Sequence, residues 1–279
     1  MKNLYSFFLL AAWMSLQGVP PPSQQVAITI DDLPFVALGQ FSFEEKHQMF
    51  IRILSTLKKY NVKIIGFTVG RTLTEENKIF LDELKREGHI IGNHTFSHPD
   101  LNKTSKDDYI LDIERGGTAI KPWLGKLKYF RYPMLHRGDT QEKHDNVLNY
   151  LKKNKYTIVP VTIDNDEWLF NQKYVEALQQ KDHLKMQKIG EAYLAHMNTE
   201  TERYVDLADE KFKRSVKHIL LIHMNVINSV YLDDLLSWYQ QEGWEFISIP
   251  EALKDPVYSM EDQYIGEWGW SWLRRIQPL

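Results

Sequence analysis

Short apolar runs rich in β-branched residues alternate with helix-patterned segments over most of this chain. Residues 26–30 (Val-Ala-Ile-Thr-Ile) form the first such run, and residues 43–60 then place apolar side chains at helical spacing. Regular alternation of this kind predicts strand–helix units and a parallel sheet covered by helices. We expect further strands at 62–69, 88–93, 128–131, 156–163, 219–222 and 244–249, and further helices at 74–87, 105–121, 140–154, 172–217 and 231–241.

The size and composition of the chain suit an α/β fold of this kind. Its 279 residues suffice for a barrel of strand–helix units, and its hydrophobic content of 43% suffices for a core. Lys and Arg number 34 against 37 Asp and Glu, which gives a net charge of −3 with both signs interspersed. Because there is no concentrated basic stripe, we expect no nucleic-acid partner. The chain has no cysteine and therefore no disulfide framework.

The first 25 residues differ from the rest of the chain. A positive start at Lys2 precedes a nearly continuous apolar run over 4–16, and 18–25 (Gly-Val-Pro-Pro-Pro-Ser-Gln-Gln) breaks it. This layout is typical of a secretory signal peptide followed by a short linker. A retained membrane anchor is the alternative, but the run is shorter than the roughly 18 residues that span a bilayer. We expect an exported protein, periplasmic or secreted, with no stable membrane anchor after cleavage between Gly18 and Gln25.

Two histidines four residues apart, His94 and His98, follow the strand expected at 88–93. A helical turn at this point would place both imidazoles on one face, as a pair of nitrogen ligands for a divalent metal requires. The adjacent carboxylates of Asp31 and Asp32 follow the first apolar run, and neighbouring carboxylates repel each other unless a cation offsets the charge. Together these residues predict a metal site.

Other polar side chains also follow expected strands. In parallel α/β folds the carboxyl ends of the strands form the rim where active sites are built. Turns alone favour Gly, Asn, Asp and Pro rather than His and Arg directly after buried strands. We therefore predict an active site at this rim. The residues expected there are Asp31, Asp32, His94, Arg131, Asp164 and His223.

In their order, these residues resemble the motifs of the polysaccharide deacetylases, the NodB-homology domains of carbohydrate esterase family four. The resemblance covers about residues 26–249. It implies a distorted (β/α) barrel of seven or eight mostly parallel strands and hydrolysis of N-acetyl groups on a glycan. The matching segments are Thr29-Ile30-Asp31-Asp32, His94-Thr95-Phe96-Ser97-His98, Arg131-Tyr132-Pro133, Asp164-Asn165-Asp166-Glu167-Trp168 and Leu221-Ile222-His223.

The resemblance also implies a role for each motif residue. Asp32, His94 and His98 would hold a divalent metal, usually Zn²⁺ with Co²⁺ as an alternative, and leave coordination positions open. Asp31 would be the general base and Arg131 its partner. His223 would protonate the leaving amine, with help from Glu167 or Asp166. The backbone N–H of Met134 would stabilise the oxyanion. Trp168 and Leu221 would either wall the pocket for the acetyl methyl group or be core residues.

Several functional alternatives remain open at this point. The same fold and metal could cleave another amide or an O-acetyl ester, and a catalytically silent carbohydrate-binding protein could keep the barrel. We expect a single catalytic domain over 26–279 with a helical insertion around 170–217, which either covers the substrate groove or serves as a structural crossover. The tail carries Trp268, Trp270 and Trp272, which either cap the barrel or form a sugar-stacking platform.

Overall fold

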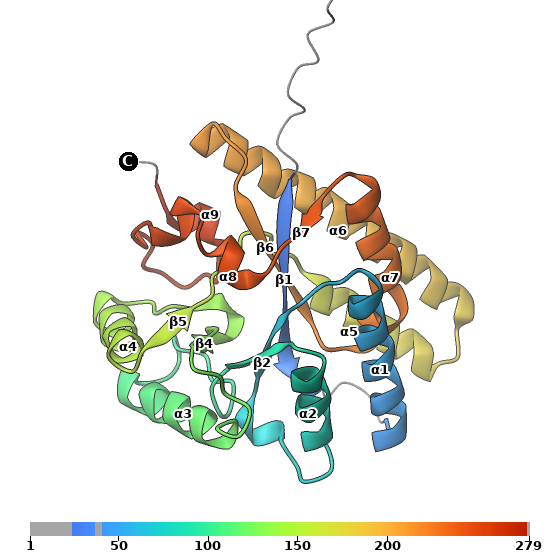
Figure 1. Cartoon of the computed structure of the whole chain (residues 1–279), viewed down its shortest axis with the longest axis horizontal. Helices are drawn as coiled ribbons and strands as arrows, with labels where there is room; N and C mark the ends of the chain where they lie inside the picture. The colour runs from blue at the N-terminus through green and yellow to red at the C-terminus, as the bar shows by residue number, and fades with distance from the viewer. Residues whose placement is uncertain (1–23, 37–40, 278–279) are drawn as a thin grey trace, which may run out of the picture.

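The computed structural model describes residues 24–36 and 41–277 of the chain and has an α/β fold (Figure 1). Its central strand, β1 (Gln25–Leu33), is buried over nearly its whole length, as parallel strands covered on both faces are. The other strands are β2 (Ile65–Thr68), β3 (Ile90–Asn93), β4 (Lys128–Phe130), β5 (Tyr156–Ile158), β6 (Lys217–His223) and β7 (Glu245–Phe246).

The strands form one curled parallel sheet in the order β5-β4-β3-β2-β1-β6. Strand β7 pairs in parallel with Gln25 and Val26 at the start of β1. The chain beyond β5 connects the two ends of the sheet, since Ile163 forms a parallel bridge with Leu220 of β6. The expected distorted (β/α) barrel of parallel strands is therefore confirmed.

The expected strand at 156–163 is shorter than predicted because Pro160 lies in its middle. Proline has no backbone N–H to donate to a neighbouring strand, so pairing with β4 ends at Val159, whose N–H donates to the Phe130 carbonyl, and pairing with β6 begins at Thr162, whose N–H donates to the Ile219 carbonyl. Strand β1, in contrast, is longer than predicted. Asp31 and Asp32 therefore lie within the end of β1 rather than beyond it.

Helices surround the sheet, and α3 and α4 lie beside β4 and β5 while α1, α5 and α7 lie together on the other side (Figure 1). Helix α1 shows why such segments form: Ser42 and Glu45 build a capping box at its start, and Phe50, Ile53 and Leu57 share its buried face. The helices are α1 (Phe43–Lys59), α2 (Lys78–Arg86), α3 (Lys106–Ala119), α4 (Gln141–Lys153), α5 (Glu167–Gln179), α6 (His183–Phe212), α7 (Val226–Gln241), α8 (Ile249–Ala252) and α9 (Trp272–Arg275), with short 3₁₀ turns η1 (Gly70–Thr72), η2 (Pro133–Leu135) and η3 (Pro256–Ser259).

The region expected to be helical over 172–217 contains α5 and α6. Helix α5 begins five residues earlier than predicted, so Glu167 and Trp168 lie in its first turn rather than in a loop. Helix α6 packs against α5 and α7. Helix α7 also begins before its predicted start, because the Asn225 side chain caps it by accepting a hydrogen bond from the Asn228 N–H.

The expected signal peptide and its cleavage region fall almost wholly on residues 1–23, outside the described residues. Within the part of the chain that the structure describes, no helix combines the length and the apolar character needed to cross a membrane.

Candidate active site

A cavity of about 630 Å³ opens at the carboxyl ends of the strands. Residues from the ends of β1 and β6, from the loops after β3 and β4, and from the start of α5 line it. The cavity brings together almost all of the residues predicted for the site. Those lining it are Asp31, Asp32, His94, His98, Met134, Asp164, Asp166, Trp168, Leu221 and His223.

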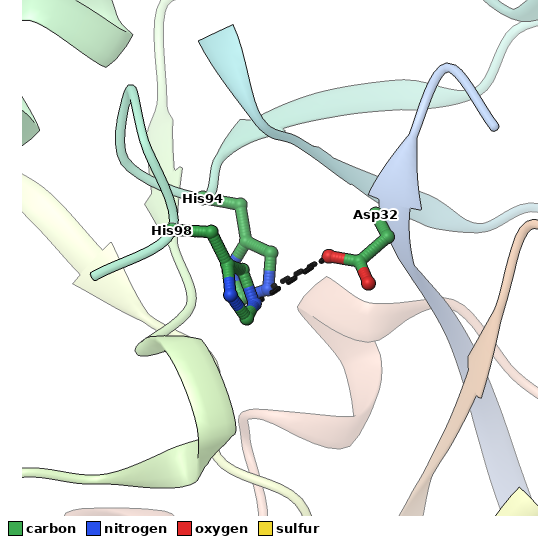
Figure 2. A group of neighbouring side chains, drawn as sticks. All are labelled: Asp32, His94 and His98. Atoms are coloured by element: carbon green, nitrogen blue, oxygen red, sulfur yellow. Dashed lines mark ion pairs between the residues drawn. The ribbon is translucent and has the colours of Figure 1, made fainter. Parts of the chain in front are cut away.

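Three of these side chains point toward one another, as Figure 2 shows: Asp32, His94 and His98. Oδ1 of Asp32 lies 3.6 Å from Nε2 of His94 and 3.5 Å from Nε2 of His98. Each residue offers one ligand atom, and the three atoms all lie within 4.8 Å of one another. Oδ1 of Asp32 is buried and has no hydrogen-bond partner within residues 24–36 and 41–277, and one carboxylate with two imidazoles is a donor set that divalent metals accept. The residues present therefore fit a metal ion.

The segment from His94 to His98 is a loop and not the expected helical turn. Thr95 and His98 have φ angles of 65° and 58°, which lie in the left-handed region. The buried carboxylate of Asp112 on α3 organises the loop by accepting hydrogen bonds from the N–H groups of Phe96 and Ser97 and from the Ser97 hydroxyl. The prediction that the two imidazoles meet is confirmed, with ring centroids 4.8 Å apart, but a different backbone achieves it.

Both histidines are prepared to bind a cation. His94 directs Nδ1 to the backbone carbonyl oxygen of Arg131 at 2.9 Å, which leaves Nε2 facing Asp32. Burial lowers the pKa of His94 and of His98 to about 4, so both rings are neutral at neutral pH. A neutral imidazole is the form that ligates metals.

Asp31 and Arg131 form a buried pair beside the three potential ligands. Nη1 of Arg131 lies 3.5 Å from Oδ2 of Asp31, and Nη2 donates a hydrogen bond to the Thr29 hydroxyl at 2.9 Å. Burial raises the pKa of Asp31, and the charge of Arg131 opposes that rise. The second carboxylate oxygen of Asp31 has no hydrogen-bond partner among the described residues. Asp31 therefore has one carboxylate oxygen held by Arg131 and a second oxygen available at the cavity.

His223 pairs with Glu167, which decides between the two acids left open by the sequence. Nδ1 of His223 lies 2.7 Å from Oε2 of Glu167, whereas Asp166 lines the cavity without contacting His223. Glu167 is completely buried and also accepts hydrogen bonds from the side-chain amides of Asn225 and Asn228. Burial lowers the pKa of His223, but the Glu167 carboxylate outweighs burial and raises it to about 9. His223 is therefore protonated at neutral pH.

Trp168 and Leu221 both line the cavity but differ in exposure. Trp168 is 49% exposed and so is not a core residue, whereas Leu221 is buried. Met134 also lines the cavity, and it follows Pro133 in a backbone conformation with φ of 54°.

Several residues of the site escaped the sequence analysis. His136 lines the cavity and contacts the Asp100 carboxylate at 2.7 Å, and Gly269 of the tail lines it as well. Trp268, which the sequence left open as part of a cap or of a sugar platform, also lines the cavity. Asp164, expected only as a polar residue at a strand end, is half-buried, and loss of solvent around its carboxylate raises its pKa to about 7. A signal existed for Trp268, since it stands in a tryptophan-rich tail, but none existed for Asn225 or Asn228.

Comparison with known proteins identifies the family. Residues 18–159 match the family model described as polysaccharide deacetylase. The chain therefore belongs to the polysaccharide deacetylase family. The match ends before Glu167 and His223, so the acid pair is defined by the geometry of this structure alone.

Individual members of the family share about 30% of the aligned residues with this chain. A peptidoglycan-N-acetylglucosamine deacetylase of Bacillus cereus is 31% identical over 150 residues, which are 53% of this chain and 48% of that protein. The chain spans about half the length of the curated relatives it matches. The solved chitin deacetylase of Colletotrichum lindemuthianum matches with a TM-score of 0.55 at 21% identity, covering 84% of this chain and 92% of that one.

A pseudoenzyme also shares the fold. BA3943 of Bacillus anthracis, a CE4 family pseudoenzyme, matches with a TM-score of 0.58 at 20% identity, covering 84% of this chain and 66% of that one. At such identities the solved structures show the fold alone. Because active and inactive proteins share it, the activity of this chain has to be argued from its own residues.

Proposed function

We propose that this chain is a metal-dependent hydrolase that removes N-acetyl groups from a glycan and releases acetate. The observation that carries the proposal is the gathering of a potential metal set, a free carboxylate and a protonated imidazole around one cavity. Relatives described as peptidoglycan and chitin deacetylases support the substrate class. Hydrolysis of an amide uses all three: the metal and the carboxylate activate the water, and the imidazole protonates the amine, which otherwise leaves poorly.

Asp32, His94 and His98 would hold the metal, with Zn²⁺ as our first choice and Co²⁺ as an alternative. When bound, such an ion supplies Lewis-acid activation of water and of the acyl oxygen. The protein residues handle the protons. Asp31, held by Arg131, takes a proton from the attacking water, and His223 donates the Nε2 proton to the nitrogen as the C–N bond breaks.

The remaining cavity residues would bind the acetyl group. We propose that the Met134 N–H donates to the oxyanion, because the left-handed turn at Met134 and Leu135 lies at the cavity. Trp168 and Leu221 would contact the acetyl methyl group. Glu167 would act through His223 by keeping that ring protonated and oriented, with Asn225 and Asn228 holding the carboxylate.

We further propose that the protein works outside the cytoplasm as a single catalytic domain over 26–279. The glycans named for its relatives, peptidoglycan and chitin, are cell-wall polymers, and the pattern of residues 1–25 favours export. A different amide or an O-acetyl ester remains the second candidate for the reaction, because the same groups serve either bond.

Acetate release from a panel of N-acetylated glycans tests the proposal. We expect release by the purified protein that a chelator abolishes and that added zinc or cobalt restores. Asp31→Asn should lower the rate at least about 100-fold, the range for loss of a general base, and leave the metal content unchanged. His94→Ala should instead lower the metal content. Full activity in Asp31→Asn would contradict the role of the base, and metal binding without release from any glycan would favour another amide or ester.

A further inference from the structure

The tail places an exposed tryptophan at the cavity. Trp268 is 62% exposed and lines the cavity together with Gly269, whereas Trp272 is buried and Trp270 stacks on Tyr264 with ring centroids 4.5 Å apart. Only Trp272 is therefore part of the core, Trp270 is 37% exposed but stacked on Tyr264, and Trp268 presents a large apolar surface to the cavity. An indole at the wall of a cavity can pack its apolar face against a bound ligand and keep its N–H for a polar partner.

The backbone around Trp268 is held in a defined place. Its N–H lies 3.2 Å from the Tyr264 hydroxyl, and the Glu267 carbonyl accepts a hydrogen bond from the Asn102 side chain at 2.8 Å. A Cβ on Gly269 would overlap the carbonyl oxygen of Met134, so glycine is what lets the tail approach the turn after β4. The tail is thus fixed against the loops that carry the proposed acetyl site.

The charge of the cavity restricts what can lie on this indole. Among the described residues that line it there is no Lys or Arg, while Asp31, Asp32, Asp164 and Asp166 all do. His223, the lining histidine that is protonated at neutral pH, pairs with Glu167. The proposed metal and His223 are engaged at the reacting acetyl group, so a sugar bearing its own carboxylate would meet like charges in the rest of the cavity with no Lys or Arg side chain among the described lining residues to pair with.

We propose that Trp268 forms a stacking platform for a second sugar ring of the glycan, and that this subsite takes neutral N-acetylhexosamine units and rejects carboxylate-bearing units. The inference rests on the proposed function and names its substrate class. The apolar face of a pyranose ring packs on an indole, and the reacting sugar occupies the neighbouring part of the same cavity. The tail then makes the protein prefer longer glycans, because an oligosaccharide can reach both the reacting site and Trp268, whereas a single sugar cannot.

Kinetics on a length series test this with the metal-loaded protein. We would measure kcat/KM for N-acetylglucosamine, for its neutral tetramer, and for a tetramer of equal length that contains muramic acid. Trp268→Ala should reduce the ratio of tetramer to monomer kcat/KM about tenfold, mainly through KM, and Trp268→Phe should restore most of it. Leu127→Ala is the matched control, because Leu127 is also 62% exposed but does not line the cavity.

A ratio that stays constant in Trp268→Ala overturns the platform, and so does an equal loss for monomer and tetramer, which a merely structural role would produce. Equal kcat/KM for the neutral and the muramic-acid tetramers overturns the charge selectivity. If the parent protein releases no acetate, the proposed function has failed, and the platform is then tested separately by titration calorimetry of the neutral tetramer. A tenfold weaker Kd in Trp268→Ala than in the parent supports the platform in that case, and an equal Kd overturns it.

Discussion

Replacing Glu167 by Gln should move the alkaline limit of activity by more than two pH units. Glu167 is buried, contacts Nδ1 of His223 at 2.7 Å, and outweighs burial to raise the pKa of that histidine from 6.5 to about 9. The difference corresponds to about 3.4 kcal/mol in favour of the protonated ring. Gln keeps the shape of Glu but removes the charge, so in the variant the pKa of His223 should return to about 6.5 or below.

The sign of the effect follows from the role of His223 as an acid. In the proposed mechanism activity requires the protonated ring, so it should be lost as pH rises through the pKa of His223. In the parent this loss is expected near pH 9, and in Glu167→Gln near pH 6.5 or lower. At a pH of about 7.5 the protonated fraction should fall from nearly all to about a tenth, so we expect the rate there to fall about tenfold.

The assay is acetate release with saturating metal across pH 5.5 to 10, analysed as kcat/KM. Glu176→Gln is a matched control, because Glu176 lies on the same helix, α5, but on its exposed face. Metal content and thermal unfolding are measured for each protein to separate folding from proton transfer. An active Glu167→Gln protein with the alkaline limit of the parent would refute the reasoning, since Glu167 would then not set the protonation of His223.

Three further predictions concern the loop, the tail and the leader. Asp112→Ala removes the carboxylate that accepts from the Ser97 N–H and hydroxyl, and leaves the Phe96 N–H with the Asp112 carbonyl alone. Zinc affinity by chelator competition should therefore fall about 10- to 100-fold, while Asp107→Ala on the exposed face of α3 should leave it unchanged; equal affinity would contradict this. Burial raises the pKa of Asp262, but His144, Arg137 and Arg275 outweigh burial and lower that pKa from 3.8 to about 2. The ionised carboxylate therefore contributes about 2.5 kcal/mol to the free energy of unfolding above pH 4, and this contribution is lost as pH falls toward 2. Urea unfolding should therefore show the deficit of Asp262→Asn shrinking below pH 4, and a constant deficit would argue against it. N-terminal sequencing of the exported protein should find a start between Gly18 and Gln25, and recovery of Met1 would contradict cleavage.

The strands and most site residues could be predicted because their signals are local. A buried parallel strand is a continuous apolar run, and the residue after it is read directly from the chain, as with His94 after β3 and Arg131 after β4. The family match over 18–159 spans the first three motifs. Local patterns therefore sufficed for the rim of the barrel.

The supporting contacts could not be predicted because they join distant parts of the chain. Asn225 and Asn228 reach Glu167 across 58 and 61 residues, and neither has a spacing relation to it. The choice between Glu167 and Asp166 follows from the start of α5, because the first turn of that helix directs Glu167 inward to His223. The place of Trp268 likewise depends on how the tail packs, which composition alone does not fix.

Backbone conformation explains why the metal set needs the rest of the fold. Asp32 has a φ of 61°, His98 of 58° and Met134 of 54°, and all three lie at the cavity. The left-handed region costs non-glycine residues roughly 1–3 kcal/mol each, so such conformations persist only where surrounding contacts enforce them. For His98 the contact is local, since its N–H donates to the Thr95 hydroxyl at 3.0 Å, while Asp112 secures the rest of the loop from α3. The sequence thus supplies the two imidazoles of the proposed metal site, and Asp112 on α3 holds the loop that turns them toward Asp32 at the end of β1.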